Sequence, residues 1–439
     1  MDVEQPHFDL TPVSTATTIE RTCQRVLLVD VRRGLRNAQA SALLIAPRMA
    51  SSPLLIGLFF PPTVGYFGDV VMGVQEFVKG GAKWVLEVYP SFEIAVASTT
   101  SWAPDGILVS NTDGDWLGLI NRLNVPTVQI GGPVMAGVPR VTTDNLAIGR
   151  IAATHFLESG FRHFAFAGYR GTDWSDERLL GYRQQLRQSG YDAASFEADH
   201  GELVARAVTG PITRWLAELP KPVALFAAHD RAAMLCANAC TFLQTRVPED
   251  IAILGVDNSL LECGFATPEL SSIMGSARRV GYEGAELLHR LMGGTVAAPT
   301  REIKVKPGGI AVRQSTDVLA IDDHDLVAAI RFIRRRSSAP IEVGDVAEAV
   351  MISRRLLERK FATLLGRTPR NEILRTRLAN AKTLLVSTDL QAIDVALQSG
   401  FPSASKFSAV FRRETGISPI EFRRLYGTHV RSAAKPTRL

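Results

Sequence analysis

The chain has 439 residues, of which 46% are hydrophobic and 21% charged, so it can form two or three globular domains with buried cores. No apolar run reaches the roughly 18 residues that cross a bilayer, and the opening MDVEQPHFDL lacks the basic and apolar regions of a signal peptide, so we expect a cytoplasmic protein with no membrane partner. Residues 325–439 hold 21 Lys and Arg against 10 Asp and Glu, which leaves residues 1–324 net acidic. This asymmetry indicates a polyanion partner for the C-terminal part, although a solvated charged surface would look the same.

Residues 1–51 show no sustained periodicity. Met49 stands directly before the first strand-like run, LLIGLFF. We therefore expect residues 1–51 to be a disordered extension or a mis-called start, with the ordered protein beginning near Ser52.

Short apolar runs then alternate with helical patterns. The runs lie at 54–60, 84–88, 105–110, 126–132, 163–168, 223–228 and 251–256. Each is bounded by Gly, Pro or charged residues, and most are followed by a helical stretch. Repeated βα units at this spacing predict an α/β domain over 52–314 with parallel strands covered on both faces. Such sheets bind ligands at the carboxyl ends of their strands.

Polar and aromatic residues gather at these strand ends, in a set that would suit a sugar. Carboxylates, amides and an Arg fork can bind hydroxyl groups, and aromatic rings can cover the apolar faces of the sugar ring. The predicted effector-binding residues are Tyr66, Asp144, Asn145, Trp174, Arg178, His229, Asp230, Asp257 and Asn258, with Phe67 next to Tyr66. For each Asp the alternative is a helix N-cap after a strand, and His229 is more often a packed or capping residue than a catalytic base.

The polar stretch 315–324 resembles a linker, and every segment after it has a helical pattern. In residues 403–414, Phe407, Val410 and Phe411 form one apolar stripe, and Ser403 is a suitable N-cap. The preceding helix presents Ile393, Val395 and Ala396 inward, and Gly400 suits the sharp turn between two helices. Lys406, Arg412 and Arg413 remain on the polar side. This pattern predicts a helix-turn-helix whose second helix fits a major groove.

The same construction occurs once before. A helix over 343–350 is followed by a short turn and by Ser353 as N-cap, and Leu356, Leu357 and Phe361 are its apolar positions. Arg354, Arg355, Arg359 and Lys360 give the outward face its charge, and Gly366–Pro369 matches Gly416–Pro419. Two such units joined by one long helix predict an all-α domain over 325–426 that reads two successive major grooves, followed by a disordered tail over 427–439.

Residues 323–426 resemble the DNA-binding domain of AraC/XylS-type transcription regulators, in ISRRLLERKF, RLANAKTLL and SGFPSASKFSAVFRRETGISPIEFRR. The body resembles the effector domain of LacI/GalR-type repressors, itself similar to periplasmic sugar-binding proteins, in PDGILVS, VTTDNLAIGRIAATHFLESGFRHFAFAG and ILGVDN. Together they resemble the xylose-operon regulator group, and nothing at the N-terminus looks like the DNA-binding domain that a LacI-type repressor carries there.

The resemblance implies a two-lobed body followed by seven helices with two recognition helices. It places Asp144, Arg178, Asp230 and Asp257 on effector-contacting positions, whereas His229-Asp230 replaces an Asn-Asp of many relatives and leaves pentose specificity open. The predicted DNA-binding residues are Ser353, Arg354, Arg355, Glu358, Arg359, Ser403, Ala404, Ser405, Lys406, Ser408, Ala409 and Arg412. The first recognition helix should read bases directly, and the small residues of the second should read methyl groups, phosphates and shape.

Enzymatic motifs are missing from the sequence: there is no G-x-G-x-x-G, P-loop, G-x-S-x-G or H-E-x-x-H. Cys23, Cys236, Cys240 and Cys263 lack metal-site or C-x-x-C spacing, so we expect reduced thiols. A sugar-binding or sugar-processing protein with a helical appendix is the main alternative. A DNA-repair methyltransferase is another, but it would need a reactive Cys in a defined motif.

We therefore expect a sequence-specific transcription activator that is not an enzyme. Its partners would be double-stranded operator DNA, a sugar effector (xylose or a related pentose), RNA polymerase and a second copy of itself in a homodimer. No cofactor and no metal are expected.

Overall fold

The computed structural model describes residues 52–60, 65–99, 104–110, 115–199, 210–294, 302–320 and 323–427. The expectations for residues 1–51 and 428–439 lie outside this part of the chain. None of the described helices is both long enough and apolar enough to span a membrane.

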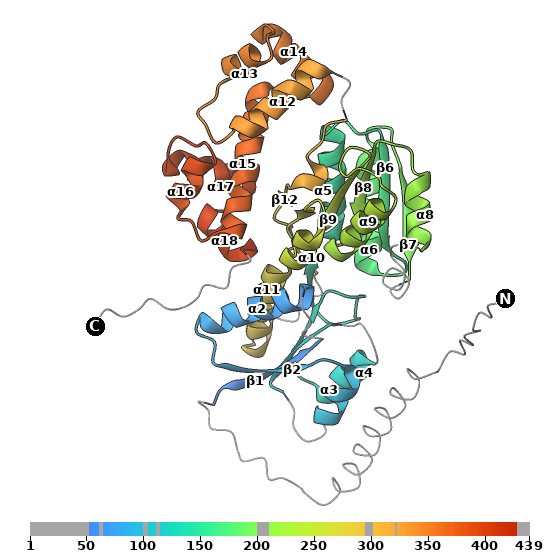
Figure 1. Ribbon diagram of the computed structural model, residues 1–439. Coiled ribbons are helices and arrows are strands. Elements are labelled where there is room, and N and C mark those ends of the chain that lie inside the picture. Colours follow the sequence, from blue (N-terminus) through green and yellow to red (C-terminus); the bar gives the residue numbers. More distant parts are fainter. Residues whose placement is uncertain are drawn as a thin grey trace, which may run out of the picture. The chain divides into compact units, whose positions relative to one another are not determined.

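The first lobe is built on a six-stranded parallel sheet with the strand order β11-β5-β4-β3-β1-β2. Its strands are β1 (Leu54–Phe59), β2 (Trp84–Tyr89), β3 (Gly106–Val109), β4 (Thr127–Ile130), β5 (Arg140–Thr143) and β11 (Ile303–Val305). Its helices are α2 (Tyr66–Lys79), α3 (Phe92–Thr99), α4 (Trp116–Leu123) and α11 (Ala277–Met292). The central strands are buried throughout, because helices α2 and α11 pack on one face of the sheet and α3 and α4 on the other (Figure 1).

The second lobe repeats this plan with the strand order β12-β10-β9-β8-β6-β7. Its strands are β6 (His163–Tyr169), β7 (Ala193–Ala198), β8 (Val223–Ala227), β9 (Ile251–Val256), β10 (Ser271–Ile273) and the short antiparallel β12 (Ile310–Ala311). Its helices are α5 (Asn145–Glu158), α6 (Asp173–Arg187), α8 (Pro211–Glu218), α9 (Asp230–Phe242) and α10 (Leu260–Phe265). One apolar core runs through the lobe, so the two sheets are stabilised separately.

All seven strand-like runs of the sequence are strands in the structure. The strands β7, β10, β11 and β12 were missed because they are two or three residues long or carry polar side chains, as in AASFEA. Such strands form through pairing with a neighbour, which a local pattern does not show.

The chain passes between the two sheets three times. The crossings lie between β5 and α5 at Asp144, between β10 and α11 at residues 274–276, and between β11 and β12 at residues 306–309. Ser276 ties them together: its hydroxyl lies within hydrogen-bond distance of Thr143 Oγ1, at 3.0 Å, and of the Val305 carbonyl, at 3.3 Å. We call these three crossings the hinge.

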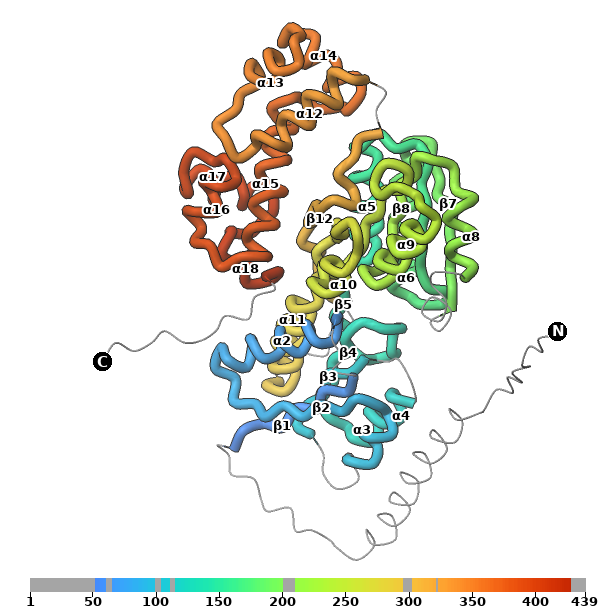
Figure 2. Tube along the Cα trace, viewed as in Figure 1, coloured from blue at the N-terminus to red at the C-terminus, as the bar shows by residue number. Residues whose placement is uncertain are grey.

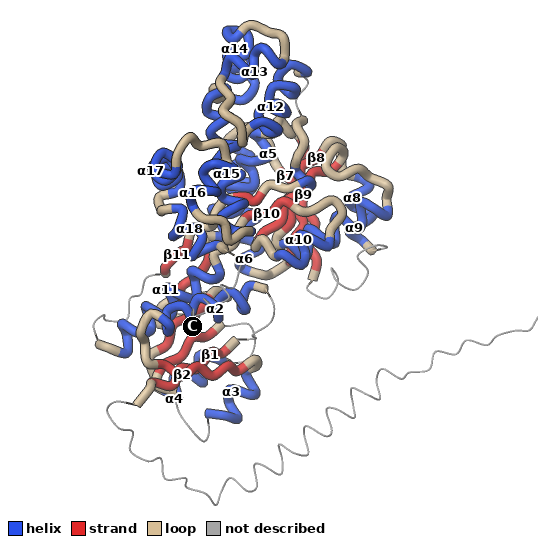
Figure 3. Tube along the Cα trace, turned by 60° about the vertical axis from the view of Figure 1, so that its left-hand side comes forward, coloured by secondary structure: helices blue, strands red, loops and turns tan. Residues whose placement is uncertain are grey.

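The C-terminal domain is entirely helical in its described residues, 323–427 (Figure 3). Its helices are α12 (His324–Arg336), α13 (Val343–Ala349), α14 (Arg354–Leu365), α15 (Pro369–Ser387), α16 (Ala392–Gln398), α17 (Ala404–Thr415) and α18 (Pro419–Tyr426). Two apolar clusters hold it together, one under α12–α14 and the other under α15–α18. Each cluster supports one helix-turn-helix unit, α13–α14 or α16–α17. Figure 2 shows the course of these four helices.

Two sequence expectations about this part of the chain need correction. The predicted linker begins too early, since Ser315 and Thr316 are buried in the second lobe, where Ser315 Oγ donates to the Ile253 carbonyl. Ile393 does not face inward: it is 52% exposed, whereas Val395 and Ala396 are buried. In a seven-residue helix the apolar stripe has room for few side chains, so one of three candidates is left outside.

Candidate effector pocket and DNA-binding surface

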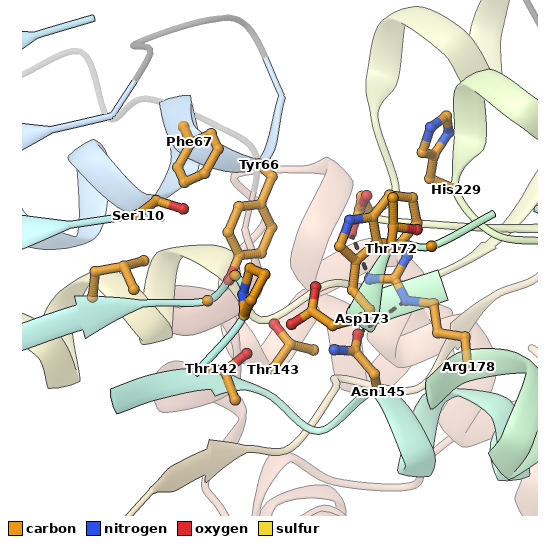
Figure 4. A pocket seen from close by; sticks show the side chains of 17 residues that line it. Tyr66, Phe67, Ser110, Thr142, Thr143, Asn145, Thr172, Asp173, Arg178 and His229 are labelled. Carbon is orange, nitrogen blue, oxygen red and sulfur yellow. Dashed lines mark hydrogen bonds and ion pairs between the residues drawn. The ribbon is translucent and has the colours of Figure 1, made fainter. Parts of the chain in front are cut away.

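A cavity of about 460 Å³ lies between the carboxyl ends of the two sheets, a volume suited to a small ligand. Six of the nine predicted effector residues line it: Tyr66, Asn145, Trp174, Arg178, His229 and Asp257. The first lobe contributes Tyr66, Phe67 and Thr143, and the second lobe faces them with Asn145 and Arg178 (Figure 4). The pocket therefore requires both lobes.

Arg178 is the best-fixed side chain of the pocket and is 4% exposed. Its Nε donates to Asn145 Oδ1 at 3.0 Å, its Nη1 donates to the Ala228 carbonyl, and its guanidinium carbon lies 5.1 Å from the centre of the Trp174 ring. Nη2 is directed to Asp257, whose Oδ1 lies 3.9 Å away. A donor and an acceptor thus stand side by side with their orientation set before a ligand arrives, which limits the entropy cost of binding.

Asp257 is held in an unusual backbone conformation. Its φ is 97°, and the next residue, Asn258, has a φ of 54°, both in the left-handed region that L-residues rarely occupy. Strain of this kind persists where the surrounding structure enforces it, often at ligand sites. Here the Asp257 N–H donates to the Ile273 carbonyl at 2.9 Å, which fixes the residue at the carboxyl end of β9.

Burial changes the acidity of several groups in the pocket. It raises the pKa of Tyr66 to about 12, although a hydrogen bond with Thr143 acts in the opposite direction, so the phenol stays protonated and can donate. Burial also raises the pKa of Asp257, and the nearby Arg178 opposes this shift. Burial lowers the pKa of Arg178, and the negative charge of Asp257 acts in the opposite direction. Each member of the pair therefore stabilises the charged form of the other.

The other three predicted effector residues do not line the pocket. Asp144 is the N-cap of α5, with Oδ1 accepting from the Ala147 N–H at 2.9 Å. Asp230 is 2% exposed and accepts from Ser272 Oγ at 2.6 Å and from the Ser259 N–H at 2.7 Å. Asn258 Oδ1 accepts from Arg313 at 2.6 Å. Asp144 thus takes the capping role that the sequence left open, whereas Asp230 and Asn258 tie neighbouring strand ends together.

His229 lines the pocket and caps α9 as well, because its Nδ1 accepts from the Ala232 N–H at 3.0 Å. Its ring is stacked with Trp174, with 5.7 Å between the ring centres. The imidazole therefore contributes an aromatic face to the pocket.

The sequence missed most of the first-lobe lining. The missed residues are Ser110, Ile130, Gly131, Gly132, Pro133, Thr142 and Thr143, with Gly171, Thr172 and Asp173 from the second lobe. Gly131 and Gly132, with φ of 57° and 70°, follow β4 and let the chain turn at the pocket wall. The GG pair after a predicted strand was a usable signal, whereas a lone Thr or Ser carries none.

The first recognition helix, α14, presents a strongly charged surface. Ser353 caps it by accepting from the Leu356 N–H at 3.2 Å, and Leu357 and Phe361 are fully buried. The predicted DNA-binding residues Ser353, Arg354, Arg355, Glu358 and Arg359 are all exposed. Arg354 Nε pairs with Glu358 at 2.9 Å. Lys360 is not an outward residue as expected, because it is held by Asp323 and Asp325 at 2.6 and 2.9 Å.

The second recognition helix, α17, has the same kind of N-cap and buried stripe as α14, and its predicted DNA-binding side chains are smaller. Ser403 accepts from the Lys406 N–H at 3.2 Å, and Phe407 and Phe411 are fully buried. The outward predicted residues Ser403, Ser405, Lys406, Ala409 and Arg412 are exposed, while Ala404 and Ser408 are half-buried. Both helices can therefore enter a groove, and they offer it different chemistry.

Comparisons with known proteins find matches for both parts of the chain. Residues 153–316 match the model of a periplasmic binding protein-like domain, and residues 346–425 match a helix-turn-helix domain. The chain is 29% identical over 378 residues to the xylose operon regulatory protein of Escherichia coli (strain K12), covering 84% of this chain and 96% of that protein. It is 28% identical to the protein of the same name from Haemophilus influenzae, covering 84% and 97%.

A solved structure described as the xylose-binding transcription activator xylR has a TM-score of 0.54 and 29% identity, covering 86% of this chain and all of that one. The chain therefore combines a periplasmic binding protein-like domain with a helix-turn-helix domain in a DNA-binding transcription regulator, and it is similar to the xylose operon regulatory proteins over most of its length.

Proposed function

We propose that this protein activates transcription in response to a small neutral sugar, xylose or a related pentose, bound between its lobes. The observation that carries the proposal is the pairing of Arg178 with Asp257 in a pocket that also has three aromatic side chains, Tyr66, Phe67 and Trp174. The similarity to regulators named for xylose supports the choice of pentose.

The charges of the pocket favour an uncharged ligand. Arg178 and Asp257 pair with each other, and Asp173 pairs with Arg140 at 2.9 Å, so each acid and each arginine among the described lining residues already has a partner of opposite charge. A hydroxyl group can accept from Arg178 and donate to Asp257 at once, whereas a carboxylate can only accept and an ammonium group can only donate. Aromatic rings then cover the C–H faces of the sugar.

The remaining partners follow from this role. Operator DNA is the ligand of the helix-turn-helix units, since α14 and α17 both present exposed basic residues. Contact with RNA polymerase belongs to the proposal because an activator must place polymerase next to its own site. The proposal also includes a homodimer. Action on DNA places the protein in the cytoplasm.

Calorimetry with a panel of pentoses tests the effector site. Asp257→Ala should weaken sugar binding about ten- to a hundred-fold, because a hydrogen bond to a charged carboxylate contributes roughly 1.5–3 kcal/mol. Asp144→Ala is the matched control: it removes a carboxylate at the end of a neighbouring strand that caps α5 and does not line the pocket. Equal sugar affinity in Asp257→Ala and the unmodified protein would move the site elsewhere.

Gel-shift titrations of the intact protein test the DNA side. Affinity for the region upstream of neighbouring sugar genes should rise about 5- to 150-fold with the effector, the usual size of an allosteric coupling. It should fall steeply with salt, since Lys and Arg displace counterions from phosphates. A sugar-binding or sugar-processing protein with a helical appendix would bind its sugar and show no such shift.

A further inference from the structure

The hinge touches the effector pocket on one side. Thr143, at the first crossing, lines the pocket. At the second crossing, a Cβ added to Gly275 would lie 2.9 Å from Asp257 Oδ1, so the backbone there passes directly against the pocket carboxylate. Any ligand that moves Asp257 or Thr143 must therefore also move the hinge.

The other side of the hinge touches the second helix-turn-helix unit through the end of α18. Tyr426 donates its hydroxyl to the Lys306 carbonyl at 3.1 Å, and its ring lies against Gly308, whose added Cβ would meet ring carbon Cδ1 at 2.9 Å. Met274, from the second crossing, is 1% exposed and belongs to the same apolar cluster as Phe407, Phe411 and Phe422. We call Met274, Lys306, Gly308 and Tyr426 the hinge dock.

The helical domain also contacts each lobe. On the first lobe, Arg278 of α11 donates Nη1 to the Gly427 carbonyl at 2.9 Å, and Arg424 lies over the Tyr282 ring at 5.5 Å. On the second lobe, Glu158 at the end of α5 accepts from Arg375 of α15 at 3.0 Å. Arg375 is held from behind by Glu372, a fully buried carboxylate.

These contacts restrict what can happen when the lobes rotate. The helix α15 links both groups of contacts, since Arg375 lies on it and α18 packs against it. A body that rests on both lobes cannot keep both sets of contacts if the angle between the lobes changes. One set must break or shift, and its free energy becomes part of the closure equilibrium.

We propose that the helical domain senses the angle between the lobes through the hinge dock, so that effector binding reorients the second helix-turn-helix unit through Tyr426. This inference rests on the proposed function, because it takes the effector to be what changes the lobe angle. It assigns to α18, which carries no predicted DNA contact, the role of coupling element.

The first experiment measures coupling in the full chain, as the ratio of operator affinities with and without xylose. Tyr426→Ala removes the ring and hydroxyl from the dock and should reduce a 5- to 150-fold ratio to less than about threefold. Ile420→Ala, on the same helix and 72% exposed, is the matched control and should keep the unmodified ratio. An unchanged ratio in a folded Tyr426→Ala protein would overturn the proposal.

A cross-link tests the dock without relying on DNA or on correct folding of Tyr426→Ala. The pair Gly308→Cys and Tyr426→Cys should form a disulfide under mild oxidation, and xylose should change the rate of its formation several-fold. The pair Gly308→Cys and Ile420→Cys should form none. Absence of the first disulfide in both states, or a rate that ignores xylose in a protein that binds it calorimetrically, would refute the inference. If the protein bound no sugar at all, the proposed function would fail, and the disulfide would still report whether the dock exists.

Discussion

The two helix-turn-helix units share one frame and carry different surfaces. Ser353 and Ser403 cap their recognition helices in the same way, and Gly366 and Gly416 end them in the left-handed conformation with φ of 63° and 81°. Outside this frame, the first half of α14 exposes four long charged side chains, whereas the first half of α17 exposes Ser405, Lys406 and Ala409. The other exposed charges of α17, on Arg412, Arg413 and Glu414, lie near its C-terminal end. The two units thus hold their recognition helices in the same way, while the side chains available to contact DNA differ.

The turns that precede these helices differ as well. In the first unit Met351 takes the left-handed position, with a φ of 55°, and is 92% exposed. In the second unit Gly400 takes it, with a φ of 80°, and a Cβ there would lie 2.0 Å from the Ser337 carbonyl oxygen. That oxygen already accepts from Arg377 Nε at 3.1 Å. The second turn is therefore packed against the end of α12, and the first faces solvent.

The largest expected effect tests whether the frames are equivalent. Phe361 and Phe411 occupy the same position in α14 and α17, and both are fully buried. Phe361→Ala and Phe411→Ala should each cost about 3–5 kcal/mol in the free energy of unfolding, through lost burial and a cavity. Denaturant unfolding of the full chain measures both. A cost below about 1 kcal/mol for either would show that one unit is held together by other contacts.

The next largest effect separates the close packing at Gly400 from the strain that a left-handed backbone causes by itself. Gly416→Ala should cost about 1–2 kcal/mol, because its φ is positive and nothing lies within 4 Å of an added Cβ. Gly400→Ala should cost about 1–3 kcal/mol more, since its Cβ meets the backbone of Ser337. Equal destabilisation of the two variants in thermal unfolding would mean that the chain around Gly400 yields freely.

The shared frame explains why this region could be predicted from the sequence. Both N-caps, both buried Phe stripes and both Gly-closed ends are local features, and local features appear in a sequence. The position of Ile393 was wrong because a short helix offers little periodicity, and its 52% exposure depends on where α17 crosses it. Lys360 was placed outward for a similar reason, since Asp323 and Asp325, which bind it, come from another helix.

The effector pocket was predictable only in part. The predicted strand ends indicate which residues lie at the pocket edge of the sheet. This criterion correctly selected Tyr66, Arg178 and Asp257, which line the pocket. They do not tell whether a side chain turns toward the pocket or back to cap a helix. Asp144 and Asp230 follow predicted strands just as Asp257 does, and the sequence therefore predicted all three as effector residues. In the structure Asp144 and Asp230 bind neighbouring protein groups instead. The positive φ of Asp257, which no sequence pattern revealed, distinguishes it.

DNA binding should sharpen the contrast between the recognition surfaces. Arg355→Ala should cost about 1–3 kcal/mol on the cognate site and relax preference at one base pair, as expected for a residue that reads a base edge. Ser405→Ala, an exposed position on α17, should cost less than about 1 kcal/mol and leave preference unchanged. Competition titrations with cognate and scrambled duplexes measure both. If Arg355→Ala weakened both duplexes equally, Arg355 would be a phosphate contact, and the two units would differ in charge alone.

The smallest effect concerns the exposed turn of the first unit. The left-handed backbone of Met351 is strained, and its side chain makes few contacts that could offset this strain, because it is 92% exposed. Met351→Gly should therefore raise the free energy of unfolding by about 0.5–1 kcal/mol, the relief of strain slightly exceeding the added freedom of Gly in the unfolded chain. Met351→Ala is the matched control: it removes the same side chain but keeps the Cβ that causes the strain, so it should change stability by less than about 0.5 kcal/mol. Thermal unfolding of the full chain compares the three proteins. If Met351→Gly were destabilising, the side chain would contribute contacts worth more than the strain, and the first turn would be as strongly supported as the second.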